Sequence, residues 1–180
     1  MTFKEYQSNA KRTCADLGSL EMNLSHMILG IISEQEEFLK AIVNHDKINI
    51  IEESADVLWY IANYCTFRNF DLEDIYNNRN DVVIEAWETE VTPYEIHASK
   101  LADYVKKFIA YKKPLDPNNE INSLRMIIDI ICGDIEEVGG DVYSALQNNI
   151  DKLKVRFPDK FSEHSALNRN IEEERKELEK

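Results

Sequence analysis

Apolar residues recur along this chain at intervals of three and four positions, which is the spacing of an amphipathic helix. Between residues 22 and 44, the apolar positions with this spacing are Leu24, Met27, Ile28, Ile31, Phe38 and Ile42. The 180-residue chain contains only 5 Gly and 4 Pro, and it has few runs of β-branched residues. Because Gly and Pro interrupt helices most strongly, this pattern predicts an all-α helical bundle.

Capping residues and helix breakers divide the predicted bundle into about seven or eight helices. Thr2 and Glu5 have the spacing of a capping box, which starts a first helix that runs to about residue 17 before Gly18 ends it. The charged C-terminal run EEERKELEK is either a helix or a frayed end. The other expected helices are 22–44, 49–67, 72–88, 94–111, 121–137 and 141–156.

The chain has the length of one ordinary domain with its own core, and we expect residues 1–180 to form a single domain. Its halves resemble a degenerate repeat, because INIIEESADVLWYI aligns with INSLRMIIDIICGDI and places Asp56 opposite Asp129. The alternative is that any two helical hairpins align at some register. The duplication hypothesis predicts a repeated hairpin unit whose second copy has lost the acidic pairs. It divides the chain into 1–92, 93–160 and a charged tail, 161–180.

The composition is that of a globular protein with a strong acidic balance. Hydrophobic residues make up 43% of the chain and charged residues 31%, and the formal net charge is −13. This charge argues against a nucleic-acid-binding protein, because contacts to the phosphate backbone need clustered Lys and Arg. A small anionic substrate stays open, since a divalent metal and a few basic residues reverse the field inside one pocket.

Location in the cell is indicated by three further features. No apolar stretch reaches the roughly 18 residues of a membrane-spanning helix. The N-terminal run MTFKEYQSNAKR lacks the apolar core of a signal peptide. Cys14, Cys65 and Cys132 are widely separated and form no CxxC motif, as expected of reduced thiols. We therefore expect a cytoplasmic protein that does not associate with membranes.

Two pairs of carboxylates have the spacing of a shared helix face. Glu34 and Glu37 lie three residues apart in one predicted helix, and Glu53 and Asp56 lie three apart in the next. The short connection NHDKIN makes these helices antiparallel neighbours, so all four carboxylates can converge. Four anions in one place repel each other unless a hard cation lies between them. Carboxylate oxygens suit Mg²⁺, with Mn²⁺ as a second possibility.

The competing interpretation is that acidic residues on helices usually form a solvated face. In this chain, however, two pairs occur on consecutive helices and each is embedded in apolar residues. Val57 and Trp59 flank the second pair, which is unusual for a face exposed to water. The sequence therefore favours a metal site over a solvated surface.

The two acidic motifs also resemble a known family. ExxE at 34–37, ExxD at 53–56, the context DVLWYIANY and the later run KLKVRFPDKF are similar to MazG-like, all-α nucleoside triphosphate pyrophosphohydrolases, a superfamily that includes the dimeric dUTPases. The resemblance implies Mg²⁺-dependent hydrolysis of a nucleoside triphosphate between the α and β phosphates, which gives a monophosphate and pyrophosphate. It also implies a homodimer or a higher homo-oligomer. The base and sugar preference stays open.

Candidate roles follow from this reaction. Glu37 is the predicted general base that takes the proton from the attacking water. Lys152 and Arg156, four residues apart on one helix, are the best candidates to bind the phosphates. Each basic residue has surface charge as its alternative, and Asn63 has a local hydrogen bond as its alternative. The weaker substrate-binding candidates are Lys107, Lys112 and Asn63.

Two other classes of protein were weighed against the enzyme. A non-catalytic helical protein that binds nucleotides or regulates a partner would fit the degenerate second half. The retained acidic quartet argues against it, because an unused cluster of anions destabilises the fold. A di-iron carboxylate bundle needs Glu-x-x-His motifs, and neither acidic helix contains one.

Overall fold

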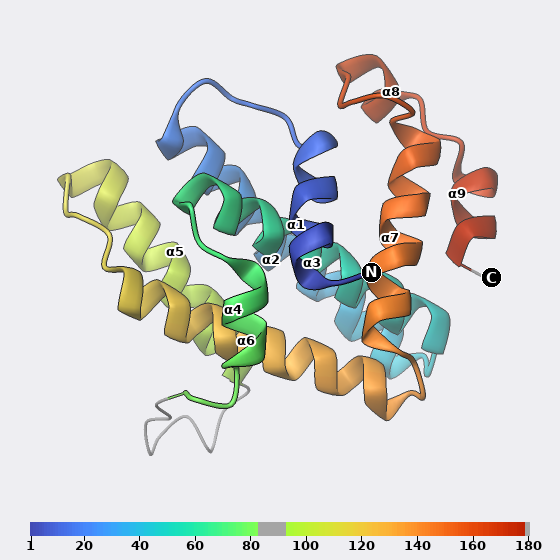
Figure 1. The fold of residues 1–180 in the computed structure, drawn as a ribbon, viewed down its shortest axis with the longest axis horizontal. Coiled ribbons are helices and arrows are strands. Elements are labelled where there is room, and N and C mark those ends of the chain that lie inside the picture. The colour runs from blue at the N-terminus through green and yellow to red at the C-terminus, as the bar shows by residue number, and fades with distance from the viewer. Residues whose placement is uncertain (83–92, 179–180) are drawn as a thin grey trace.

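The computed structural model describes residues 1–82 and 93–178. Within these ranges the regular structure is helical and contains no strand, so the all-α prediction is confirmed. The helices of this part of the chain are α1 (Phe3–Arg12), α2 (Leu20–Val43), α3 (Lys47–Arg68), α4 (Leu72–Asn77), α5 (Pro93–Tyr111), α6 (Pro117–Glu137), α7 (Val142–Arg156), α8 (Glu163–Leu167) and α9 (Ile171–Leu178) (Figure 1).

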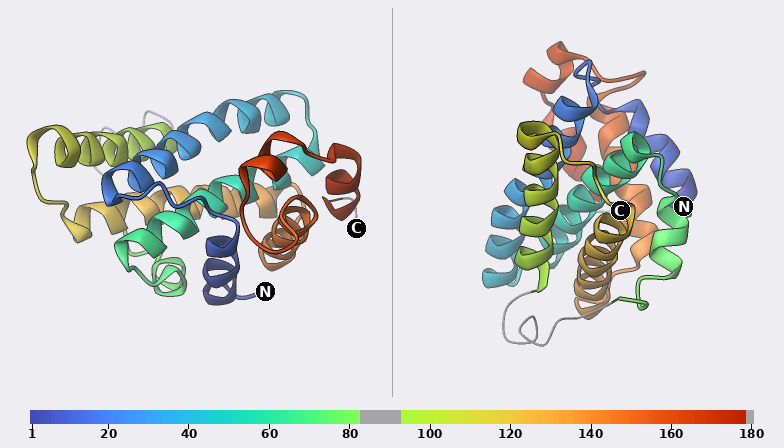
Figure 2. Two further views of the ribbon diagram at one scale, coloured as in Figure 1. Left: turned by 90° about the horizontal axis from the view of Figure 1, so that it is seen from above. Right: turned by 90° about the vertical axis from the view of Figure 1, so that its left-hand side faces the viewer.

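Two long hairpins, α2–α3 and α5–α6, form the centre of the molecule. Helix α2 packs against α5 and helix α3 packs against α6, so the hairpins lie side by side. Helices α1, α4 and α7 cover the opposite side of α3 and α6 (Figure 2). Helices α3 and α6 therefore form a middle layer with helices on both sides.

Helix α3 is buried around most of its circumference because it lies in this middle layer. Its buried residues include small and apolar side chains on several faces, such as Ala55, Val57, Leu58 and Ile61. A helix that is apolar nearly all round belongs to the interior of a protein. This position explains why apolar residues flank the acidic pair of this helix.

The turn between α2 and α3 sets the register of the acidic residues. Asn44 ends α2, His45 adopts a positive φ of 54°, and the Asp46 side chain accepts a hydrogen bond from the Asn49 backbone N–H at the start of α3. Glu37 and Glu53 lie eight residues before and after His45. In an antiparallel hairpin, residues equidistant from the turn face each other.

Several predicted boundaries needed correction. Helix α1 ends at Arg12 rather than near 17, because Thr13 leaves the helical conformation as its C-cap. Helix α6 begins at Pro117, earlier than the predicted 121, because Asp116 caps it and Pro117 fits the first helical position. The described part of the charged tail is helical, and this helix, α9, packs against α7.

The prediction of a helix over 72–88 is only partly confirmed. Helix α4 ends at Asn77, and residues 78–82 form turns and irregular backbone. The remainder of that prediction, and the boundary expected at 89–92, lie outside the described residues. The chain forms the two hairpins α2–α3 and α5–α6, and their origin in an internal duplication stays a prediction. Among the described helices, none is long and apolar enough to cross a bilayer.

Candidate metal and nucleotide site

Three of the four predicted metal ligands converge between α2 and α3. Glu34, Glu37 and Glu53 each offer a carboxylate oxygen, and these three oxygens lie within 4.8 Å of one another. Glu34 and Glu53 are half-buried, whereas Glu37 is exposed. The cluster thus combines an interior part with one carboxylate that reaches solvent.

The pKa values of two of these carboxyls show how poorly the chain itself compensates their charge. Burial, with repulsion from Asp56 and Glu37, raises the pKa of Glu34 to about 7. Burial, with repulsion from four neighbouring carboxylates, raises the pKa of Glu53 to about 8. A hard divalent cation would remove this repulsion. Because Mg²⁺ prefers carboxylate oxygens as ligands, the chemistry of the three converging donors fits such an ion.

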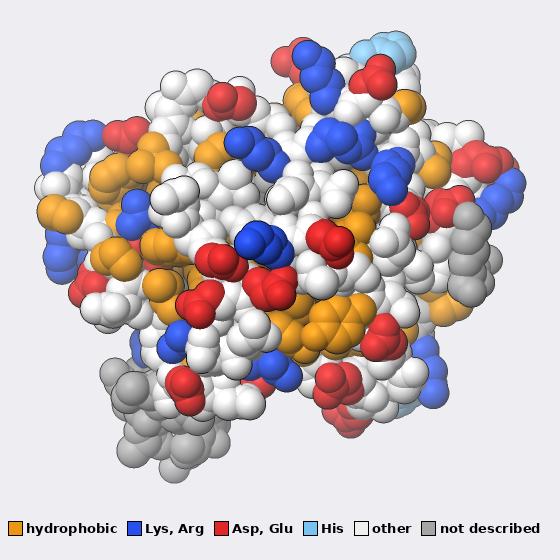
Figure 3. Space-filling model, viewed as in Figure 1, with side chains coloured by type: hydrophobic (Ala, Val, Ile, Leu, Met, Phe, Trp, Pro, Cys, Tyr) orange, Lys and Arg blue, Asp and Glu red, His pale blue; other side chains and the backbone are white. Residues whose placement is uncertain are grey.

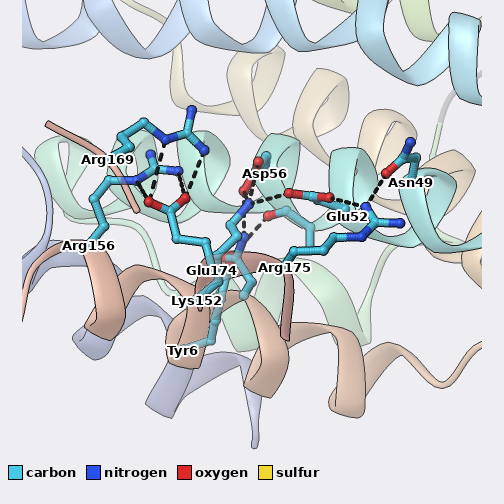
Figure 4. Close-up of polar contacts among 11 residues, drawn as sticks. Tyr6, Asn49, Glu52, Asp56, Lys152, Arg156, Arg169, Glu174 and Arg175 are labelled. Atoms are coloured by element: carbon cyan, nitrogen blue, oxygen red, sulfur yellow. Dashed lines mark hydrogen bonds and ion pairs between the residues drawn. The ribbon is translucent and has the colours of Figure 1, made fainter. Parts of the chain in front are cut away.

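Asp56, the fourth predicted ligand, is held by two residues of α7. The Lys152 ammonium Nζ lies 2.7 Å from each carboxylate oxygen of Asp56 (Figure 4). Asn149 Nδ2 donates to Asp56 Oδ1 at 2.6 Å. Lys152 also lies 3.3 Å from Glu52 Oε1. The structure therefore places Asp56 beside the cluster of three, in contact with a cation from the chain.

Lys152 itself lies in a different environment from the predicted one. Its side chain is 1% exposed, so it faces Asp56 and Glu52 rather than an open phosphate site. Burial favours the neutral amine, but attraction to Asp56 and Glu52 outweighs burial and raises the pKa of Lys152. Lys152 is accordingly a buried ammonium that contacts Asp56 and Glu52, and its predicted role as a direct phosphate contact stays a prediction.

A buried tyrosine supports this arrangement from α1. Tyr6 Oη lies 2.8 Å from Asn149 Oδ1 and 3.0 Å from the Ala55 carbonyl oxygen. Because the amide oxygen of Asn149 faces this hydroxyl, its Nδ2 group is directed toward Asp56. Helices α1, α3 and α7 are thus connected through one carboxylate.

The acidic residues line a cavity of about 340 Å³, within the range of about 300–1,000 Å³ that is usual for small-molecule sites. Its walls combine acidic, aromatic and basic side chains. The lining residues are Thr13, Ala15, His26, Glu34, Glu37, Glu52, Glu53, Asp56, Trp59, Tyr60, Leu153, Arg156, Phe157, Phe161, Ala166 and Arg169.

One wall is aromatic and is fixed by a close approach between α2 and α3. A Cβ atom at Gly30 would lie 2.1 Å from the Tyr60 ring, so only glycine leaves room for this side chain. Trp59 packs edge-on against Tyr60, with 4.9 Å between ring centroids, and its Nε1 donates to Thr13 Oγ1 at 3.0 Å. Both rings therefore border the cavity in defined positions.

Two arginines supply positive charge to the cavity wall. Arg156, at the end of α7, was a predicted phosphate contact, and the structure places it in the cavity wall. Arg169, between α8 and α9, joins it there and was not predicted. Both guanidinium groups bind Glu174 of α9. Figure 3 shows Lys and Arg side chains gathered near the end of α7 and around α8.

Sequence reasoning missed Arg169 and Glu174 because nothing in their spacing connects them to the acidic motifs. Arg156 and Glu174 are 18 residues apart, with the short helix α8 and irregular backbone on both sides of it between them. The abundance of charge in the tail indicated solvated helix rather than a buried carboxylate. No local pattern in this segment marks Glu174 as different from its neighbours.

The structure places three weaker candidates outside this cavity. Asn63 is buried, and its Nδ2 donates to the Trp59 carbonyl oxygen at 3.0 Å, which is the local hydrogen bond given as its alternative. Lys107 lies 2.5 Å from Asp103 one turn away, and Lys112 lies 3.8 Å from Glu21. None of the three lines the cavity, so their predicted substrate contacts have no support from its geometry.

A comparison with protein families matches this part of the chain. Residues 23–81 fit the model of the MazG nucleotide pyrophosphohydrolase domain. This segment belongs to the MazG-like superfamily. The matched range contains all of α3 and all four predicted metal ligands. Searches of curated proteins and of solved structures found no match.

Proposed function

We propose that this MazG-like protein hydrolyses a nucleoside or deoxynucleoside triphosphate in a Mg²⁺-dependent reaction. The products would be the monophosphate and pyrophosphate. The observation that carries this proposal is the convergence of Glu34, Glu37 and Glu53 within the segment that matches the MazG domain. The cavity beside them has the size and the mixed lining of a small-molecule site.

The three converging carboxylates are the residues that would hold Mg²⁺, or Mn²⁺ in its place. When bound there, the metal would polarise the phosphoryl oxygens and lower the pKa of a water. Asp56 is the proposed fourth ligand. Asn149 and Lys152 fix the orientation of its carboxylate from the side of α7.

Glu37 is the proposed general base. It is the exposed member of the cluster of three, so water reaches its carboxylate without crossing the protein interior. A base that accepts the proton of an attacking water must lie within hydrogen-bond reach of that water. Glu34 and Glu53, which are half-buried, are better placed to hold the metal.

The triphosphate would extend from the acidic cluster toward Arg156 and Arg169. Both side chains line the same cavity as the carboxylates. Guanidinium groups stabilise the negative charge that develops on the phosphates during hydrolysis. Trp59 and Tyr60 offer ring faces and edges for a base, although part of their surface is used for packing within the protein.

A non-catalytic nucleotide-binding protein is the second candidate, and one observation favours it. The Lys152 ammonium already neutralises Asp56, so one predicted metal ligand has a cation partner within the chain. In such a protein the acidic cluster would remain while turnover is lost.

We also propose that the protein is cytoplasmic and forms a homodimer or higher homo-oligomer. All three cysteines are free thiols, as is usual in a reducing compartment.

The proposed homo-oligomer is supported by a surface of α2. This helix exposes a row of large apolar side chains on its outer face, which marks a surface suited to another protein. The row consists of Met22, Leu29, Ile32, Leu39 and Val43.

The test is pyrophosphate release from a panel of NTPs and dNTPs, with Mg²⁺, Mn²⁺ or EDTA. Wild type is compared with Glu53→Gln, and Glu36→Gln is the matched control. Glu36 lies on α2 outside the cavity, where it pairs with Lys40. We expect metal-dependent release that Glu53→Gln abolishes and Glu36→Gln retains. Failure to release pyrophosphate from any nucleotide, in folded protein that binds the metal, would support the non-catalytic candidate.

A further inference from the structure

Glu174 joins the two arginines of the cavity wall from behind. Its side chain is 3% exposed and does not line the cavity. Arg156 contacts it through Nε at 3.1 Å and Nη2 at 2.5 Å. Arg169 contacts the same two oxygens through Nε at 3.5 Å and Nη2 at 2.8 Å. One buried carboxylate thus receives two guanidinium forks (Figure 4).

This geometry leaves donors available on both arginines. A guanidinium carries five N–H donors, and a side-on contact through Nε and Nη2 uses two of them. Three N–H donors on each of Arg156 and Arg169, two residues that line the cavity, are therefore not used by Glu174. Since one carboxylate faces two guanidinium groups, the three side chains together keep one positive charge.

Helix α9 is itself fixed to the helix that carries the acidic ExxD motif. Arg175 Nη1 donates to Asn49 Oδ1 at 2.6 Å and lies 3.3 Å from Glu52 Oε2. Glu52 also contacts Lys152, and α9 packs against α7. The position of Glu174 is therefore set relative to α3 and α7, the two helices on which the site is built.

We propose that Glu174 is a positioning residue that orients Arg156 and Arg169 for binding a polyphosphate chain. The inference rests on the proposed function, because it names the residues that recognise the phosphates of the same substrate. A rival account is that Glu174 occupies the phosphate position and competes with the substrate. Its location behind the arginines, outside the cavity lining, favours the positioning role.

The two accounts predict changes of opposite sign. Glu174→Gln keeps the shape of the side chain but removes its charge. If Glu174 positions the arginines, the variant binds phosphate more weakly, although the site has gained positive charge. If Glu174 competes with phosphate, the variant binds more tightly. The matched control is Glu173→Gln, which removes a charge from the same helix at an exposed residue that pairs with Lys176.

The experiment measures tripolyphosphate binding by calorimetry, and KM and kcat for the best nucleotide of the panel. We expect Glu174→Gln to weaken tripolyphosphate binding about tenfold and to raise KM by a similar factor, with a smaller change in kcat. Glu173→Gln should match wild type. Unchanged or tighter tripolyphosphate binding by Glu174→Gln would overturn the proposal.

A second variant keeps the test decisive if Glu174→Gln fails to fold. Arg169→Lys retains the positive charge on a partly exposed loop residue but cannot form the two-point contact with Glu174. Weaker tripolyphosphate binding by this variant supports oriented recognition, and unchanged binding contradicts it.

Tripolyphosphate binding is measured without any turnover of a nucleotide, so this test is independent of the proposed reaction. A protein that hydrolyses no nucleotide but loses tripolyphosphate affinity in Glu174→Gln would refute the proposed reaction and retain the role of Glu174.

Discussion

The ammonium of Lys152 lies 2.7 Å from both carboxylate oxygens of Asp56, and the lysine side chain is almost completely buried. This contact joins α7 to the helix that carries two of the predicted metal ligands. It gives Asp56 a fixed orientation and a cation partner, whereas Glu34, Glu37 and Glu53 form a cluster of three converging carboxylate oxygens. The acidic quartet is thus divided into one carboxylate paired with Lys152 and three carboxylates whose oxygens could hold a metal ion.

Lys152→Met should destabilise the protein because it leaves Asp56 without its cation. Removing one partner of a buried ion pair costs about 3–5 kcal/mol, and we expect the lower end because Asp56 is partly exposed. Mg²⁺ should restore part of this loss by binding the released carboxylate. Urea denaturation with EDTA or Mg²⁺ measures both effects. Lys154→Met, at an exposed ion pair with Asp151, is the control and should change stability little.

The close approach at Gly30 predicts an effect on the aromatic wall. Gly30→Ala would place a methyl group 2.1 Å from the Tyr60 ring, so the ring must move out of its present position. We expect a loss of about 1–3 kcal/mol in the free energy of unfolding and a raised KM for nucleotides, because Tyr60 lines the cavity.

Gly133→Ala provides the matched control for this substitution. Gly133 lies within α6, and an added Cβ meets no atom within 4 Å. The same change should therefore stabilise the protein by about 0.5–1 kcal/mol, since alanine is the better helix former. Equal effects of the two substitutions in thermal and urea denaturation would show that Tyr60 does not occupy the space beside Gly30.

Stability without metal should fall as the pH rises. The pKa values of Glu34 and Glu53 in the folded protein are about 7 and about 8, above the ordinary value of 4.5. A carboxyl whose pKa is raised by folding stabilises the folded state fully below its unfolded pKa, and this contribution is lost as the pH rises through the folded pKa. We therefore expect the free energy of unfolding in EDTA to decrease between about pH 5 and pH 8.

Two comparisons isolate the carboxyls responsible. Glu53→Gln should flatten the pH dependence, because the amide does not ionise. Mg²⁺ should also flatten it, because a bound cation favours the ionised carboxylates. A wild-type profile in EDTA that is flat from pH 5 to 8, measured by urea denaturation, would contradict the raised pKa values.

The acidic cluster was predictable because its information is local. The spacing of Glu34 and Glu37, the spacing of Glu53 and Asp56, and the short turn between their helices fix which faces meet. The two hairpins and most of the boundaries of the long helices followed from periodicity and caps in the same way. The family match over 23–81 covers this locally encoded part of the site.

Of the basic side chains that line the cavity, the sequence pointed to Arg156 but not to Arg169, because the basic wall depends on how distant segments pack. Lys152 and Arg156 lie one turn apart on α7, yet Lys152 is buried against Asp56 whereas Arg156 lines the cavity. Helical periodicity does not reveal which neighbour each will meet. Glu174 shows the same limit, because a buried carboxylate in a run of acidic residues has no distinguishing sequence signal.

The exposed row on α2 predicts self-association. Leu29 is 66% exposed and lies near the middle of the row that also contains Ile32 and Leu39. If this face pairs with a second copy, Leu29→Lys places charges in an apolar interface and should convert the protein to a monomer. Light scattering coupled to size-exclusion chromatography measures the mass. Leu167→Lys, at an exposed apolar residue of α8, is the control and should leave the mass unchanged.

A wild-type protein that is monomeric at tens of micromolar, or a Leu29→Lys variant that keeps the wild-type mass, would exclude α2 as the interface. The catalytic proposal would stand in either case, because all of the described cavity lining comes from one chain.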